Sequence, residues 1–171
     1  MLKPDSLRAA ICTVLPDLTR DPERLLMWID KGGVRSTLTD RLAFTTNYTL
    51  NVIALGLGAG HELALHIAVL YWLRTNQPML LSAKEDAFTF EVDVLDNGQV
   101  DIAIRLTLSE TVSATQREDG GFDMQVKAEP NPLFPDLLGL GDVDPIPPLS
   151  EIWLNPGGKL LPEDTPVEPA P

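Results

Sequence analysis

Apolar and polar residues alternate along residues 42–54. The even positions are mostly apolar, whereas threonine and asparagine fill most of the odd positions between them. A period of two predicts a β-strand with one buried face and one face in water. Glycines at positions 56, 58 and 60 then end the strand. The face that we expect to be buried consists of Leu42, Phe44, Thr46, Tyr48, Leu50, Val52 and Ala54.

A long apolar segment follows the glycines. Ten of the fifteen residues in 61–75 are apolar, and they occupy nearly every side of a helix. A helix that is apolar nearly all round is buried on more than one side. In a chain of 171 residues, another subunit can supply one of those sides. We therefore expect His66 and Trp72 of this helix to lie at an interface between subunits.

The first 40 residues predict a helix and then a hairpin. Pro4 and Asp5 suit the first turn of a helix, and Pro16 should end the regular helix early because proline lacks an N–H donor. Glycines at 32 and 33 separate residues 25–29 from residues 34–38, so we expect a β-hairpin around them. The apolar stripe of the helix consists of Leu7, Ile11, Val14 and Leu18.

Two further hairpins are predicted between residues 88 and 126. A two-residue loop at 97–98 would pair Val94 with Asp101 and set an apolar residue against a polar one. A three-residue loop at 96–98 pairs Val94 with Val100 instead, and it places Gly98 in the left-handed conformation. We therefore expect the three-residue loop. The second hairpin is weaker and more exposed, and it faces Val112 and Ala114 with Phe122, Met124 and Val126 across residues 119–121.

These elements predict an α+β fold in which two helices pack on an antiparallel sheet. Composition then divides the chain into an α+β domain, 1–128, and a proline-rich acidic arm, 129–171. The arm holds eleven of the fifteen prolines, and eight acidic residues against one lysine give it about −7 of the net charge of −12. A small hairpin is expected near 151–161. Its apolar residues should dock on a neighbour or on the core, because a lone hairpin is marginal in water; the candidate contact residues of the arm are Phe134, Leu137, Leu138, Trp153 and Leu154.

The net charge, the cysteine count and the length of the apolar helix bear on the partners and the cellular compartment of the protein. A net charge of −12 argues against nucleic acid as a partner, since phosphate binding needs lysine and arginine to displace counterions. The single Cys12 cannot form an internal disulfide, which fits a reducing cytoplasm. No signal peptide and no membrane span are expected, because the helix at 61–75 falls short of ~20 residues and contains His66.

Three patterns invite a catalytic or cofactor reading. His61 and His66 resemble a zinc-protease helix, but residues five apart lie about 140° apart around a helix and cannot reach one metal. Gly56, Gly58 and Gly60 resemble a dinucleotide fingerprint, but the third glycine comes one position early. Asp93 and Asp101 fall on the wet face of a hairpin. We therefore expect no catalytic residue, no metal and no cofactor, and hence a protein that is not an enzyme.

Several stretches of the chain match one known family in order along nearly its whole length. The match rests on their collinearity rather than on any one motif, and it ends in a proline-rich linker and a final hairpin. The chain departs from the pattern at Pro16 and in an apolar insert around 134–142. It resembles the tail completion protein R family of contractile-tailed temperate phages; the matching stretches are 1–8, 21–22, 28–36, 48–53, 72–78 and 101–104.

The resemblance implies a structural role in the virion tail. Such proteins are similar to tail terminators, whose subunits form a ring on the finished tail, stop growth of tube and sheath, and present a surface to the head. The implied partners are further copies of the chain, in a hexamer on the family resemblance alone, together with tube, sheath and neck or head-completion proteins. Assembly would take place in the host cytoplasm. The alternatives are a neck or head-completion protein and a tail-assembly chaperone absent from the finished particle.

Overall fold

One antiparallel sheet forms the body of the subunit. The computed structural model describes residues 2–36, 42–58, 60–82 and 84–129, together with the backbone of 153–154 and 158–159. The strand order is β1-β2-β4-β3, and β5 also pairs with β4. Both β3 and β5 occupy the edge of β4 that β2 leaves free, at opposite ends of that strand. The strands are β1 (Leu25–Ser36), β2 (Leu42–Leu57), β3 (Thr89–Val94), β4 (Val100–Gln116) and β5 (Phe122–Val126).

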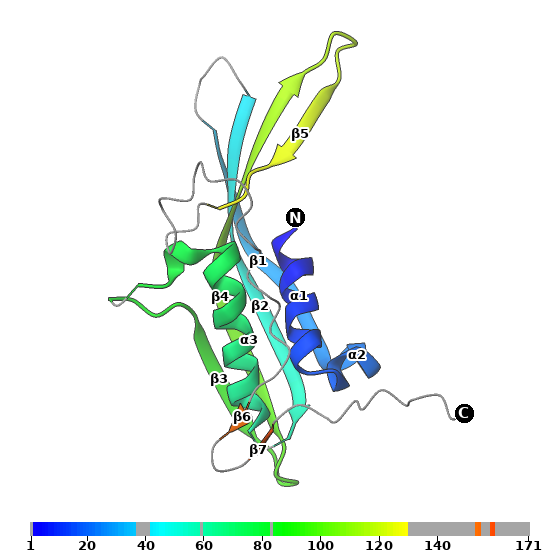
Figure 1. Cartoon of the computed structure of the whole chain (residues 1–171), viewed down its shortest axis with the longest axis vertical. Coiled ribbons are helices and arrows are strands. Elements are labelled where there is room, and N and C mark those ends of the chain that lie inside the picture. Colours follow the sequence, from blue (N-terminus) through cyan, green and yellow to red (C-terminus); the bar gives the residue numbers. More distant parts are fainter. Residues whose placement is uncertain are drawn as a thin grey trace, which may run out of the picture.

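Two helices, α1 (Lys3–Val14) and α3 (His61–Asn76), lie side by side on one face of this sheet (Figure 1). Alternate side chains of β2 and β4 point at the helices and form the core, because successive residues of a strand face opposite sides. The α+β fold class predicted above is therefore confirmed. Three short turns of helix complete the described part: α2 (Asp17–Arg20), η1 (Pro22–Arg24) and η2 (Pro78–Leu80). The largest fully buried side chains include Leu7, Ile11, Leu50, Leu65, Leu73, Ile104 and Leu106.

The strongest patterns of the sequence are confirmed. Strand β2 spans the alternating segment, and α3 spans the apolar one. Helix α1 ends two residues before Pro16, as expected from a residue that cannot donate an N–H. The stripe at 7, 11, 14 and 18 is buried, although Leu18 belongs to α2 after a break in the helix.

The hairpin predicted around glycines 32 and 33 is wrong. Residues 25–36 form one continuous strand, β1, which pairs with β2 along its whole length. The pairing register shifts between Ile29 and Lys31, so Asp30 is the extra residue of a bulge. Before the bulge the odd positions face the helices; after it the even positions do. The two glycines lie inside the strand, with Gly32 opposite Tyr48.

Both hairpins predicted between residues 88 and 126 form, and the register predicted for the first is confirmed. Val94 pairs with Val100, and Leu95 donates its N–H to the Gln99 carbonyl, so three residues form the loop. Gly98 has a φ of 78°, which is the left-handed conformation that the loop requires. In the second hairpin, Arg117 donates its N–H to the Gly121 carbonyl, so the loop is 118–120 and begins one residue earlier than predicted. Strand β5 sets Met124 opposite Ala114, and every residue of β5 is exposed.

The C-terminal hairpin also forms, as β6 (Trp153–Leu154) paired with β7 (Gly158–Lys159). Phe134, Leu137 and Leu138 lie outside the described residues. The division into a domain and an arm stays a prediction. One contact bears on where the arm starts: Lys3 Nζ lies 2.8 Å from a carboxylate oxygen of Glu129, which ties that residue to α1.

Candidate assembly surfaces

The sheet is longer than the helices that cover it. Beyond the N-terminal end of α1, strands β1, β2, β4 and β5 continue as a projection with no helix on either side (Figure 1). In the body, α1 and α3 bury the helix-side face of the sheet. In the projection, the described residues leave the same face open.

The open part of that face is apolar. The register sets Leu42 opposite Ala114, which in turn faces Met124, so these three side chains share one side of the sheet. Val34 is 70% exposed and Met124 is 72% exposed. On the opposite side the same strands carry threonine, serine and glutamine. We call the apolar side the distal face; it consists of Val34, Leu42, Phe44, Val112, Phe122, Met124 and Val126.

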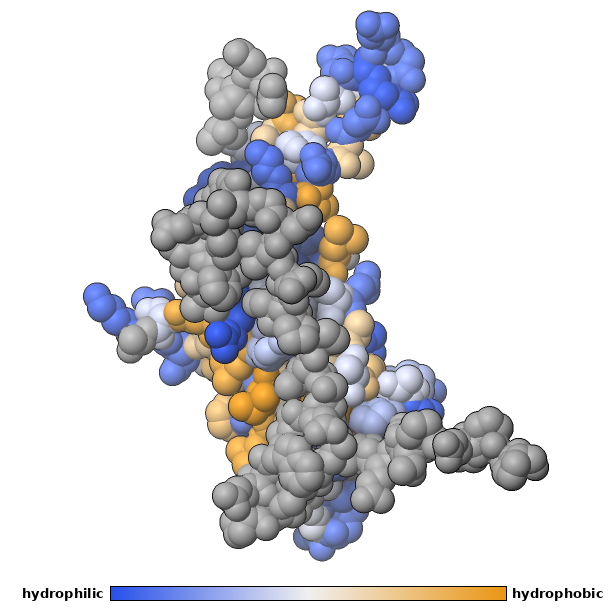
Figure 2. All heavy atoms as spheres, in the orientation of Figure 1, coloured by the Kyte–Doolittle hydropathy of each residue, from blue (hydrophilic) through white to orange (hydrophobic). Residues whose placement is uncertain are grey.

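A second apolar surface lies at the other end of the subunit. Helix α3 packs Leu65 and Val69 against the sheet, while Leu63 and Ile67 point away from it and are 46% and 44% exposed. Figure 2 shows apolar residues over α3 and β3, and others near β5 at the upper end. A helix that is apolar on opposite sides needs cover on both. We call this the α3–β3 surface: Leu63, Ile67, Phe90, Val92 and Val94.

His66 belongs to the α3–β3 surface. Its ring centroid lies 4.5 Å from that of Phe90 and 5.7 Å from that of Phe88, so it bridges α3 to β3. Burial lowers the pKa of His66 below its usual value, an effect that the Glu62 carboxylate partly opposes. The ring is therefore neutral at pH 7 and adds to the apolar character of the surface. Its part in assembly stays a prediction.

Trp72 lies in the subunit core rather than on either surface. Its side chain is 4% exposed, and its Nε1–H donates to the Ser6 hydroxyl at 3.0 Å, which joins α3 to α1. The indole therefore has almost no area left for another subunit. The sequence could not distinguish the inner side of α3 from the outer one, because both are apolar.

A buried carboxylate of β4 caps α1. Glu110 is 4% exposed, and it accepts the backbone N–H of Leu2 at 3.0 Å, that of Lys3 at 3.3 Å and the hydroxyl of Tyr48. Helix α1 has no side-chain cap of its own, so Glu110 satisfies free N–H groups at the positive end of the helix dipole. This cap was not predicted from the sequence. Its one signal was a glutamate at a position where the alternation of β4 calls for an apolar residue.

Side chains also close the gap between β3 and β5 on the edge of β4. Gln77 Oε1 accepts the N–H of Ser109 at 3.1 Å, and Lys3 Nζ donates to the Ser109 carbonyl at 2.6 Å. The same ammonium group donates to Gln77 Oε1 at 2.7 Å and to Glu129 at 2.8 Å. Four parts of the chain therefore meet at one buried lysine: the start of α1, the end of α3, the middle of β4 and the first residue of the arm.

Replacing Tyr48 by phenylalanine should make stability less sensitive to acid. Burial alone would raise the pKa of Glu110, but hydrogen bonds from Tyr48 and the Leu2 and Lys3 amides outweigh it and hold that pKa below its usual value. A lowered pKa in the folded state adds stability above the unfolded value, and this is lost as the pH falls through the folded pKa.

We expect Tyr48→Phe to lower the free energy of unfolding by about 1.5–3 kcal/mol at pH 7, the range for a hydrogen bond to a charged group. Urea unfolding of both proteins across the acid range measures the effect. The difference should shrink once Glu110 is protonated, since the lost bond is then one to a neutral group. An equal loss at every pH would contradict the role given to the carboxylate.

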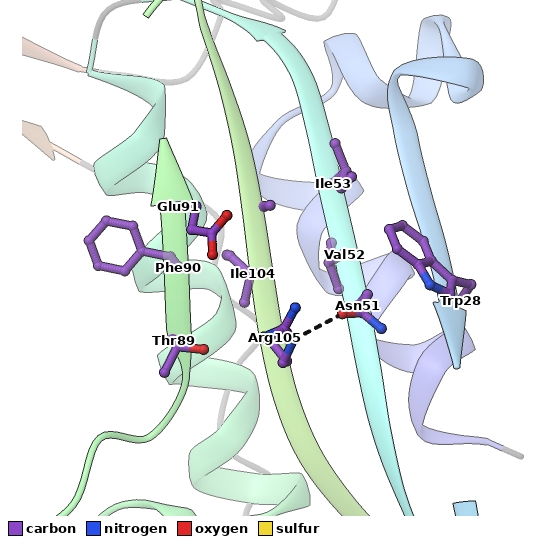
Figure 3. Close-up of a pocket in the computed structure, with 10 residues that line it drawn as sticks. Trp28, Asn51, Val52, Ile53, Thr89, Phe90, Glu91, Ile104 and Arg105 are labelled. Atoms are coloured by element: carbon purple, nitrogen blue, oxygen red, sulfur yellow. Dashed lines mark hydrogen bonds between the residues drawn. The ribbon is translucent and has the colours of Figure 1, made fainter. Parts of the chain in front are cut away.

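The face of the sheet away from the helices carries a shallow groove of about 200 Å³ (Figure 3). Trp28 of β1 borders one side, and Glu91 of β3 borders the other. Between them Arg105 Nε donates to Asn51 Oδ1 at 3.3 Å. The Asn51 amide nitrogen is buried, and no acceptor for it lies among the described residues. The groove therefore offers hydrogen-bond donors, but it brings together no nucleophile and general base.

The histidines, glycines and aspartates that resemble catalytic or cofactor motifs lie in helix α3, in the segment before it and in one strand pair of the fold. His61 is the first residue of α3, and Gly60 before it has a φ of 86°. Asp101, opposite Asp93, accepts the N–H of Gly56 at 2.7 Å. Within the described ranges, no three histidine, cysteine or acidic side chains come together as metal ligands. No helix of the described residues is long and apolar enough to span a membrane.

Comparison with known proteins places the chain in a family. The sequence profile described as P2 phage tail completion protein R (GpR) matches residues 1–130. The tail completion protein R of Escherichia phage P2 is 37% identical over 138 residues, which cover 79% of this chain and 88% of that protein. No solved structure gives a significant match.

Proposed function

The chain belongs to the phage tail completion protein R family, and from that premise we propose that it closes the finished tail as a ring of identical subunits. The ring would cap the tube and sheath, stop their growth and present a surface for head joining. The observation that carries this proposal is the pair of unlike apolar surfaces at the two ends of the subunit. Each of these surfaces is stabilised when another apolar surface covers it, and a neighbouring copy of the chain offers one.

The exposed apolar side chains support an assembled state. Covering a large apolar side chain contributes roughly 1.5–3 kcal/mol, and the distal face alone exposes several of them. Exposed apolar patches of this extent usually mark interaction sites. The proposed partners are therefore further copies of the chain, six on the family resemblance alone, and beyond them the tube, sheath and neck proteins. The role is structural rather than catalytic.

A growing tube exposes at its tip the same surface that each new ring of tube protein would bind. Growth stops when a subunit with the matching half of that interface and a dissimilar opposite face covers the tip. We expect tails made without this chain to keep their baseplates but to lose length control or fail to join heads. Purified protein added to such finished tails should restore joining, as seen by electron microscopy of deletion-mutant lysates.

Two other roles predict different results. A tail-assembly chaperone would leave too few tubes, would not restore joining after late addition, and would be absent from washed particles. A neck or head-completion protein would be found on heads and on joined particles, and washed unjoined tails would carry no copy of it. Failed late addition together with absence from the particle would rule out the capping ring.

A further inference from the structure

We propose that the distal face of one subunit packs on the α3–β3 surface of a second copy of the chain. This contact would be the repeating interface of the ring, so the inference rests on the proposed function and names the surfaces that build it. It commits to a neighbouring copy as the occupant of both surfaces.

The positions of the two surfaces favour a copy as the occupant. The distal face lies beyond the start of α1 (Figure 1). Lys3 at that start bonds to Gln77, the residue after α3, so Leu63 and Ile67 lie on the half of α3 farthest from it. Because the two surfaces are unlike and lie at opposite ends of the subunit, a contact between them joins copies head to tail. Contacts of this heterologous kind close into rings when the rotation between copies allows it.

The packing of α3 on its own sheet also indicates how the α3 helix of a neighbour can cover the distal face. Helix α3 covers the even positions of β4 in its own subunit, such as Ile104 and Leu106. The distal face continues the same row of side chains through Val112 and Ala114. The outer side of a neighbour's α3 can therefore cover the distal face in the way that its inner side covers its own sheet.

The dimensions agree with this arrangement. Five residues of a strand span about 16 Å at ~3.3 Å per residue, and four strands at ~4.8 Å spacing span about 14 Å across. On the neighbour, Leu63, Ile67 and Leu70 cover about 10 Å along α3 at ~1.5 Å per residue. The distal face can thus take two turns of helix, with Phe90 of β3 beside them.

Disulfide cross-linking on tails tests the contact. In chains with Cys12→Ser, Met124→Cys is placed in one protein and Ile67→Cys in another, and both are added to tails that lack the chain. We expect a mixture of the two to give covalent dimers, and either protein alone to give none. A chain that carries both cysteines should give a ladder of multimers that ends at the ring.

Charged substitutions test the same contact without requiring the two cysteines to lie close enough for a disulfide. Met124→Glu should reduce attachment to tails at least tenfold, whereas Gln125→Glu, its neighbour on the opposite side of β5, should not. Ile67→Lys in the same chain as Met124→Glu should restore attachment, because each interface then pairs a lysine with a glutamate. A purely structural effect of Met124→Glu would not be rescued in this way.

Three outcomes would overturn the inference. They are attachment without any link between 124 and 67, dimers of Met124→Cys alone, and a link between Ile67→Cys and Trp153→Cys within one chain. The last would mean that the arm covers the α3–β3 surface of its own subunit. Absence of the unmodified chain from washed tails would instead contradict the proposed function itself.

Discussion

Replacing Glu110 by alanine should lower the free energy of unfolding by about 3–5 kcal/mol, because three donors lose their acceptor at roughly 1–3 kcal/mol each. The carboxylate accepts two backbone N–H groups and the Tyr48 hydroxyl, and alanine would leave all three donors without this acceptor. Since typical domains are stable by about 5–15 kcal/mol, a large part of the total would be lost. Chemical denaturation monitored by tryptophan fluorescence measures the loss.

Two control substitutions show whether the lost hydrogen bonds of the carboxylate cause the loss of stability. Glu110→Gln keeps the shape and one acceptor oxygen, so it should cost less than alanine. Thr107→Ala alters an exposed residue of the same strand on the face away from the helices, and it should cost less than about 1 kcal/mol. If Glu110→Ala were no worse than Thr107→Ala, the carboxylate would not be the cap of α1.

Cutting the chain after Glu129 should leave a folded subunit that attaches poorly to tails. Every described helix and all five strands of the sheet precede that residue, and the cut keeps the bond between Lys3 and Glu129. The lost arm carries Phe134, Trp153 and Leu154. Burying one such side chain contributes roughly 1.5–3 kcal/mol, so attachment should fall at least about tenfold.

Thermal unfolding and co-sedimentation with tails separate the two effects. The shortened chain should unfold cooperatively within a few degrees of the full chain, while much less of it pellets with tails. Trp153→Ala should weaken attachment in the same direction but less severely. If the shortened chain unfolds or precipitates, the arm is part of the subunit's own core and the predicted boundary is wrong.

The elements whose periodicity is unbroken could be predicted from the sequence. Strand β2, helix α3 and the register of the β3–β4 loop each follow from local spacing and one turn residue, Gly98. Strand β1 could not, because the bulge at Asp30 reverses which positions face the helices. In a sequence, a switch of the helix-facing positions from odd to even beside two glycines looks the same as a turn between two strands.

The assembly surfaces were predictable only in part. The apolar excess of α3 indicated a second covered side, but it could not show that Trp72 faces inward and Ile67 outward. Met124 was recognised as part of an exposed hairpin. Its significance depends on where the helices end relative to the sheet, which no local pattern contains. The same holds for Glu110, whose partners at residues 2 and 3 lie more than 100 positions away.

End-on electron microscopy of washed tails, with and without the purified chain, tests the central claim most directly. We predict that tails with the chain carry one additional closed ring at the tip opposite the baseplate, and that tails without it end in bare tube protein. Averaged views should show contacts only between neighbouring subunits, each joined head to tail. A single copy at the tip, or no added density although joining is restored, would contradict the account.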